Sequence, residues 1–196
     1  MEPELPDARR LVAAALAFEA ALVLVALGLG WFLNRPPLAQ IDWTVQSVGH
    51  GLLATLPLIA GLVLITRYPL GPLKALDEVV RQFLVPLFRP ARLWQLFLIS
   101  ALAGIGEEFL FRGVFQAGLE QFSGSQWLAL AVASLLFGLA HPITVTYLVL
   151  ASLIGVYLGW LWLATDNLLV PIITHGAYDF VALVYLIRRT TAPAVG

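Results

Sequence analysis

The chain has 196 residues, of which 60% are hydrophobic and only 12% are charged. Soluble domains carry about 25% charged residues, and apolar runs of about 20 residues recur along the whole chain. A net charge of -1 excludes the basic footprint of a nucleic-acid-binding protein, and the absence of cysteine excludes disulfides and thiolate chemistry. The composition therefore predicts a multi-pass integral membrane protein whose main partner is the lipid bilayer, with residues 1–196 forming one domain.

The predicted fold class is all-α, a polytopic membrane bundle of about six transmembrane helices. The expected spans are 11–33, 45–66, 94–119, 126–141, 144–163 and 168–187. Each is near the length of about 20 residues that a helix needs to cross the hydrocarbon, except the fourth, which is short.

The connector 67–93 is the only long one, and it predicts one interfacial or cytoplasmic amphipathic helix without chemistry of its own. Pro86 and Pro90 are expected to close this helix. Its apolar residues at helical spacing are Leu73, Leu76, Val80, Phe83 and Leu87.

The basic residues predict the orientation, because cytoplasmic loops are enriched in Lys and Arg. With the N-terminus in the cytoplasm, nine of the eleven basic residues lie inside; Arg35 lies outside and Arg112 lies within a span. Both termini and the 67–93 connector are therefore expected on the cytoplasmic side, and the plasma (inner) membrane is the expected location.

Small residues predict where the helices approach closely. Ala151, Gly155 and Gly159 recur every four residues in the fifth span, and Gly113 and Ala117 share a stripe of the third. Such residues let a neighbouring backbone come near in a membrane bundle.

Charged residues stand in the middle of the third span, where each costs at least a few kcal/mol unless it is paired or functional. Glu108 and Arg112 are four residues apart and are natural partners on one helix face. Glu107 is rotated by about 100° and remains free of that pair, so it can face a cavity as a base. The alternative is that both glutamates only bond to other helices.

Two later spans add histidines. His141 precedes Pro142, which ends or kinks its helix, and alone it could be an interfacial polar residue. His175 and Asp179 share a helix face, as suits a metal ligand with its neighbour, a histidine with an orienting carboxylate, or a buried polar pair that fixes two helices. Glu19 and His50 receive no catalytic role.

Taken together, Glu-Glu-x-x-x-Arg (107–112), Phe-x-x-x-His (137–141) and His-x-x-x-Asp (175–179) resemble the CPBP family of intramembrane proteases. This family of CAAX proteases and bacteriocin-processing (Abi) enzymes includes the type II CAAX prenyl endopeptidases. The resemblance covers 94–187, which would be a catalytic core of four helices. It implies an intramembrane endopeptidase that hydrolyses a peptide bond of a membrane-associated peptide or protein.

The resemblance also implies a role for each matching residue. Glu107 would activate water with the help of His141, and Glu108 and Arg112 would support the site. His175 would stabilise the oxyanion or bind metal. Asp179 stands where the prenyl proteases have asparagine.

A metal centre is the alternative to this metal-free mechanism, which we favour. Glu107, His141, His175 and Asp179 offer two oxygen and two nitrogen ligands, which suit one zinc ion. Two other classes of function stay open: a non-catalytic membrane scaffold or chaperone-like subunit of the same fold, and an ion or proton transporter.

Overall fold

A computed structural model describes residues 8–191, and all the regular structure in this part of the chain is helical. The all-α membrane bundle is confirmed, and the chain is an integral membrane protein. Five helices are long and apolar enough to cross a membrane. They are α1 (Ala8–Phe32), α2 (Val45–Arg67), the continuous helix from α5 (Leu93–Glu108) to α6 (Ala117–Ser123), α8 (Val145–Thr165) and α9 (Leu169–Thr191).

The predicted fourth span is a shorter helix, α7 (Gln126–Leu139), of 14 residues. At 1.5 Å per residue it is about 21 Å long, which is less than the hydrocarbon core of about 30 Å. Ser125 caps its start by accepting a hydrogen bond from the Leu128 N–H, and the helix ends before His141 instead of at it. The turn between α7 and α8 therefore ends inside the bundle, and it carries His141.

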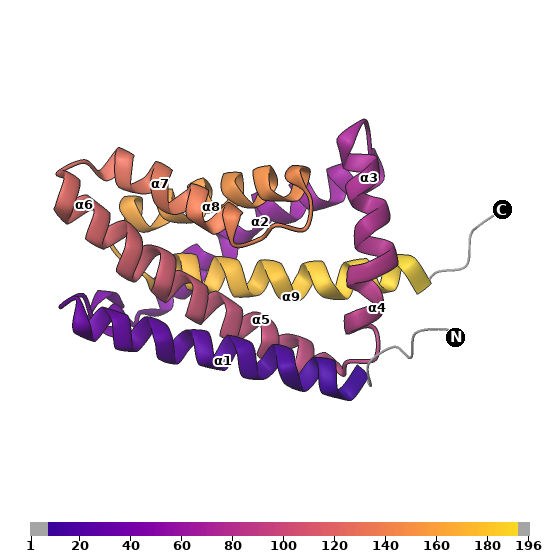
Figure 1. Cartoon of the computed structure of the whole chain (residues 1–196), viewed down its shortest axis with the longest axis horizontal. Coiled ribbons are helices and arrows are strands. Elements are labelled where there is room, and N and C mark those ends of the chain that lie inside the picture. The colour runs from indigo at the N-terminus through magenta and orange to yellow at the C-terminus, as the bar shows by residue number, and fades with distance from the viewer. Residues whose placement is uncertain (1–7, 192–196) are drawn as a thin grey trace.

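Helix α9 lies in the middle of the bundle, between α5 and α2, while α1 runs along α5 and α7 lies against α8 (Figure 1). Glycine makes the central contact possible. A Cβ atom on Gly104 of α5 would lie 2.8 Å from the Gly176 nitrogen and 2.9 Å from the Ile172 carbonyl oxygen of α9. Since only a residue without Cβ fits there, α5 and α9 meet backbone to backbone beside Glu107 and His175.

The small residues predicted in the fifth span do face close neighbours. A Cβ atom on Gly155 of α8 would lie 3.1 Å from the Cα atom of Ser134 in α7. One on Gly159 would lie 2.5 Å from the side chain of Gln116. Close approach also exposes backbone oxygens of α8 to the third span. The carbonyl oxygens of Gly155 and Gly159 accept hydrogen bonds from the side chains of Arg112 and Gln116.

The connector is helical, as predicted, but its buried face differs. It consists of α3 (Pro72–Val79), the π-helical η2 (Val80–Leu84) and α4 (Val85–Phe88). Leu76 and Val80 are buried as expected, whereas Phe83 is 65% exposed and Val85 is buried in its place. The wide turn of η2 explains this, because an i→i+5 turn rotates the following residues away from 3.6-residue periodicity.

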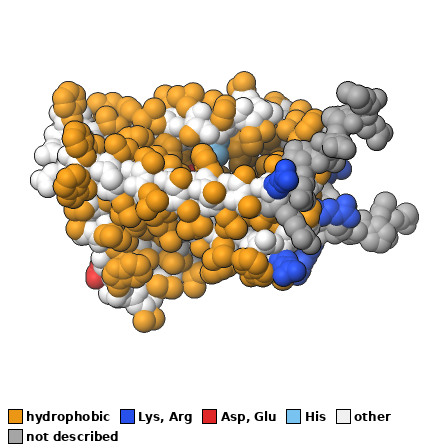
Figure 2. Space-filling model, turned by 60° about the horizontal axis from the view of Figure 1, so that its bottom comes forward, with side chains coloured by type: hydrophobic (Ala, Val, Ile, Leu, Met, Phe, Trp, Pro, Cys, Tyr) orange, Lys and Arg blue, Asp and Glu red, His pale blue; other side chains and the backbone are white. Residues whose placement is uncertain are grey.

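Pro86 lies at the start of α4 instead of closing the helix, whereas the helix does end, at Phe88, before Pro90. The connector is tied to the end of α9 by Arg189, whose Nη1 atom lies 2.6 Å from Asp77 Oδ1. Lys and Arg side chains gather at this end of an otherwise apolar surface (Figure 2). Such clustering at one end is what the predicted orientation requires.

Candidate active site

Glu107 and Glu108 are the last two residues of α5, and the π-helical segment η3 (Phe109–Gln116) follows them directly. The Ala117 N–H donates to the carbonyl oxygen of Arg112, five residues earlier. Wide turns of this kind inside α-helices are frequent at functional sites. The predicted third span is therefore one helix whose winding changes immediately after the two glutamates.

Glu108 is fully buried and accepts two charged hydrogen bonds. Its Oε1 atom lies 2.8 Å from Arg112 Nη1 and 2.8 Å from His175 Nδ1. The predicted pairing with Arg112 is confirmed, and the contact with His175 adds a third member from α9. Glu108 therefore joins the two helices and fixes the orientation of the histidine ring.

Arg112 is held from three sides. Besides Glu108, its Nη2 atom donates to the Gly155 carbonyl oxygen at 2.9 Å, and its guanidinium carbon lies 4.7 Å from the centre of the Phe137 ring. A buried guanidinium needs such partners because its desolvation costs several kcal/mol. The arrangement gives Arg112 a supporting position, away from Glu107.

Glu107 faces His141 across a short gap. Its Oε2 atom lies 3.6 Å from His141 Nε2, and this buried oxygen has no hydrogen-bond partner. The predicted separation of the two glutamates is therefore present: Glu108 pairs with Arg112, and Glu107 faces His141 in the turn after α7.

The hydrogen bond at the other ring nitrogen defines the tautomer of His141. Nδ1 lies 2.7 Å from the Phe137 carbonyl oxygen, which can only accept, so Nδ1 carries a proton. Burial lowers the pKa of His141 below its usual value of 6.5, although the bond to Phe137 works in the opposite direction. The ring is therefore neutral at pH 7, and Nε2 presents a lone pair to Glu107.

Two acceptors that face each other need a donor between or beside them. A water molecule has two O–H groups and can donate one to the carboxylate of Glu107 and one to Nε2 of His141. Sharing water between an acid side chain and a histidine is also the arrangement that general base catalysis uses.

His175 lies between two carboxylates. Nδ1 donates to Glu108, and Nε2 lies 3.3 Å from Asp179 Oδ2, so the predicted pair of His175 and Asp179 is present. A neutral ring that donates from Nδ1 would turn a lone pair toward Asp179. The contact therefore needs one more proton, either on Nε2 or on Asp179. In both cases the pair of His175 and Asp179 holds a proton that it can donate, and this pair lies beside Glu107 and His141.

Phe137 connects the two halves. Its ring centre lies 4.7 Å from that of His141, 5.7 Å from that of His175 and 4.7 Å from the Arg112 guanidinium carbon. Sequence reasoning quoted Phe137 only as part of a motif and gave it no position. Its spacing of four residues from His141 was the available signal, since residues four apart lie together in a helical turn; the hydrogen bond from His141 Nδ1 to the Phe137 carbonyl oxygen keeps them close although α7 ends at Leu139.

The four predicted zinc ligands do not form one set. They divide into Glu107 with His141 and His175 with Asp179, and no group of three or more acidic, histidine or cysteine side chains in the described chain 8–191 is placed to hold a metal ion. Each His175 nitrogen also already contacts a carboxylate. Because this arrangement does not fit a zinc centre, the mechanism below uses no metal.

The site is partly open to the surroundings of the protein. Hydrophobic side chains cover most of the molecular face that Figure 2 shows. The side chains of His141 and Asp179 are 26% and 32% exposed, whereas those of Glu108 and His175 are closed off.

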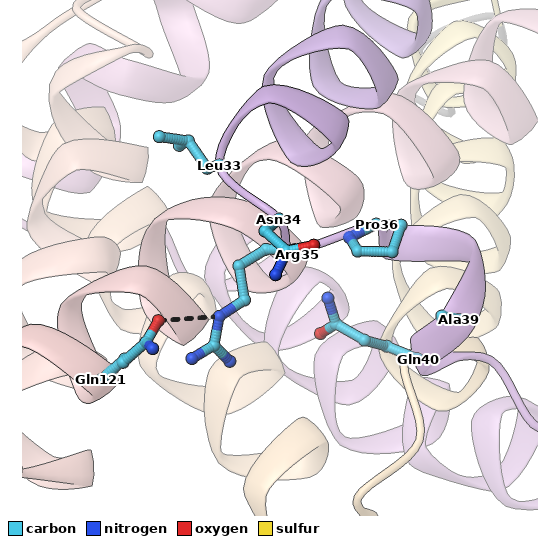
Figure 3. A pocket seen from close by; sticks show the side chains of 7 residues that line it. All are labelled: Leu33, Asn34, Arg35, Pro36, Ala39, Gln40 and Gln121. Carbon is cyan, nitrogen blue, oxygen red and sulfur yellow. Dashed lines mark hydrogen bonds between the residues drawn. The ribbon is translucent and has the colours of Figure 1, made fainter.

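A hollow lies away from these residues. It has a volume of about 310 Å³ and is lined by the loop after α1 together with Gln121, whose Oε1 atom accepts a hydrogen bond from Arg35 Nε at 3.0 Å (Figure 3). None of the predicted catalytic residues lines it, so we assign it no part in the chemistry.

Comparison with known families agrees with the three motifs. Residues 89–181 match the family of type II CAAX prenyl endopeptidases, Rce1-like. The predicted resemblance is confirmed for this segment, which contains both glutamates, Arg112, both histidines and Asp179. No curated protein and no solved structure matches the chain. At the family level, the Rce1-like segment indicates proteolysis of the CAAX-protease type in the membrane.

Proposed function

We propose that the protein is an intramembrane endopeptidase in which Glu107 and His141 activate a water molecule for hydrolysis of a peptide bond. The observation that carries this proposal is that Glu107 Oε2, a buried oxygen without a hydrogen-bond partner, lies 3.6 Å from Nε2 of a neutral His141. Both side chains belong to the segment that matches the protease family.

In the proposed reaction, Glu107 takes a proton from the shared water molecule. The oxygen atom of this water then attacks the scissile carbonyl carbon. The tetrahedral intermediate then collapses as the C–N bond breaks, and Glu107 gives the proton to the leaving nitrogen. His141 holds the water by accepting its second O–H group at Nε2, which the bond from Nδ1 to Phe137 keeps unprotonated. The hydrogen bond to the backbone thus gives His141 a definite role.

His175 is the proposed donor to the oxyanion. Its contacts with Glu108 and Asp179 leave an extra proton at this end of the site, and a positioned donor stabilises the developing negative charge. Asp179 already contacts Nε2 of His175. In the transition state the oxygen of the substrate carbonyl group would take the place of Asp179 as the acceptor at Nε2. Glu108 and Arg112 would act through His175 by holding its ring.

The proposed substrate is a membrane-associated peptide or protein, because hydrophobic side chains cover the face of the molecule shown in Figure 2 and five helices are apolar and long enough to cross a membrane. The cytoplasmic position of the connector 67–93 and of both ends, and location in the plasma membrane, remain proposals that rest on the charge distribution. The end of α9 and the connector do lie together; the residues before 8 and after 191 lie outside the described part.

The test is Glu107→Gln in the purified full-length protein in proteoliposomes. Glutamine keeps the size but removes the base, so we expect a loss of cleavage of a model membrane peptide by about two to four orders of magnitude. The melting temperature in detergent should stay close to that of the wild type, since no ion pair depends on Glu107. Glu78→Gln, on the exposed face of α3, is the matched control.

Turnover by Glu107→Gln at near the wild-type rate would disprove the assignment. If Glu107→Gln is inactive as expected, comparison of membrane proteomes that contain wild type or this variant identifies the substrates. Ion uptake into the same proteoliposomes, equal in both proteins, would instead favour the transporter alternative.

A further inference from the structure

Glu19 of α1 reaches the site from a helix that the family match does not include. It lies one heptad after Val12 and one before Ala26, both buried, so it occupies the face of α1 that packs on the bundle. Its partner on α5 is Gly106, where an added Cβ would lie 3.2 Å from the Val23 nitrogen and 3.4 Å from the Glu19 carbonyl oxygen. Gly106 immediately precedes Glu107, so α1 brings Glu19 next to the proposed base.

The Glu19 carboxylate acts on the site itself. It interacts electrostatically with Glu107, Asp179 and His175, and its Oε2 atom is buried without a hydrogen-bond partner. Glu107, whose residue is only 9% exposed, has an unpartnered buried oxygen as well. Acceptors shielded from water in this way cost free energy unless a donor joins them.

Charge points in the same direction. Four carboxyl groups, those of Glu19, Glu107, Glu108 and Asp179, interact with the cations Arg112 and, when it is protonated, His175. Arg112 is already used by Glu108 and by a backbone oxygen. The carboxyl groups of Glu19 and Glu107 are thus left without a cation of their own, and in an apolar surrounding a cationic donor that reached them would be bound strongly.

We infer that Glu19 is a specificity-determining residue that binds a basic side chain of the peptide substrate, lysine or arginine, near the scissile bond. The inference rests on the proposed function and adds a substrate class to it. An ammonium or guanidinium group supplies the donors that the buried oxygen of Glu19 lacks, and it favours the ionised form of this carboxyl group.

The test measures binding instead of cleavage. Two fluorescent apolar 20-residue peptides, one with a single central lysine and one with norleucine there, are titrated into proteoliposomes of Glu107→Gln, which prevents hydrolysis. We expect this protein to bind the lysine peptide about tenfold more tightly. The double variant Glu19→Gln/Glu107→Gln should lose that preference, whereas Glu78→Gln/Glu107→Gln should keep it.

Equal binding of the two peptides by Glu107→Gln would overturn the inference. An undiminished preference of Glu19→Gln/Glu107→Gln for the lysine peptide would overturn it as well. So would about one zinc bound per chain that is lost with Glu19→Gln, because the cation would then be a metal ion. Wild-type turnover by Glu107→Gln would instead refute the proposed function, so the two failures are distinguishable. An unchanged melting temperature of the Glu19 variant shows that binding, and not folding, has changed.

Discussion

Glu108→Gln should destabilise the protein far more than Glu107→Gln, although the two residues are neighbours. Glu108 is fully buried and its Oε1 atom accepts hydrogen bonds from Arg112 and His175 at 2.8 Å each. Glutamine keeps one oxygen but removes the charge, and its amide group adds two donors beside a buried guanidinium. Arg112 would therefore remain in the interior without its counter-ion.

The magnitude follows from these contacts. Hydrogen bonds to charged groups contribute about 1.5–3 kcal/mol each, and breaking a buried ion pair from one side costs about 3–5 kcal/mol. For a chain of this size, 1 kcal/mol changes the melting temperature by about 2–4 °C. We therefore expect Glu108→Gln to lower the melting temperature by about 10 °C, together with activity, because His175 loses the carboxylate that orients it.

The assay is thermal unfolding in detergent of wild type, Glu108→Gln, Arg112→Met and the double variant, with Glu78→Gln as the exposed control. Removing both charges at once leaves no uncompensated ion, so the double variant should be more stable than Glu108→Gln alone. A melting temperature of Glu108→Gln within about 2 °C of the wild type would refute the ion pair. Strictly additive losses would show that the two side chains do not interact.

Three further predictions concern other parts of the molecule. Asp179→Asn should keep activity within about tenfold and chelators should inhibit little, because asparagine still accepts a hydrogen bond from His175; an inactive variant with about one zinc per wild-type chain would reverse the choice against metal. Single cysteines in the connector 67–93 should resist impermeant thiol reagents in intact cells, and labelling from outside would overturn the orientation. In ¹⁵N NMR of labelled histidine, His141 should carry its proton on Nδ1 at pH 7 and become charged only below pH 6.5. The free energy of unfolding should therefore fall as the pH is lowered below that value. A charged His141 ring at pH 7 would contradict this prediction.

Contacts within one helix could be predicted from the sequence. Glu108 with Arg112 and His175 with Asp179 are both separated by four residues, and helical geometry alone places each pair together. The same rule separates Glu107 from Glu108. Composition and the length of the apolar runs were enough for the all-α membrane class, because the backbone must satisfy its own hydrogen bonds in lipid.

Contacts between helices could not be obtained in this way. No spacing indicates that His175 donates to Glu108 or that His141 lies 3.6 Å from Glu107. The sequence did contain one relevant sign, the short fourth span, since a helix of 14 residues leaves His141 inside the bundle. Glu19 received no role from the sequence, because a single carboxylate in a span has no partner at helical spacing.

The connector shows a different limit. The expected apolar face assumed 3.6 residues per turn throughout, whereas η2 winds more widely and brings Val85 into the core in place of Phe83. The sequence 80–84 gives no glycine or proline that would mark this change. Periodicity therefore predicted the helix but not its orientation after the wide turn.

The neighbouring glutamates also separate the protease from the scaffold alternative. A scaffold needs Glu108, Arg112 and His175, which pair with one another and join α5 to α9. It gains nothing from Glu107, whose buried oxygen lacks a hydrogen-bond partner and costs about 1–3 kcal/mol. Nor does it need a neutral His141 that turns its lone pair toward that oxygen. Glu108 also has one unpartnered oxygen, but its other oxygen holds Arg112 and His175. Glu107 makes no such pair, and a water molecule in the gap would offset its cost, which agrees with the proposed catalysis.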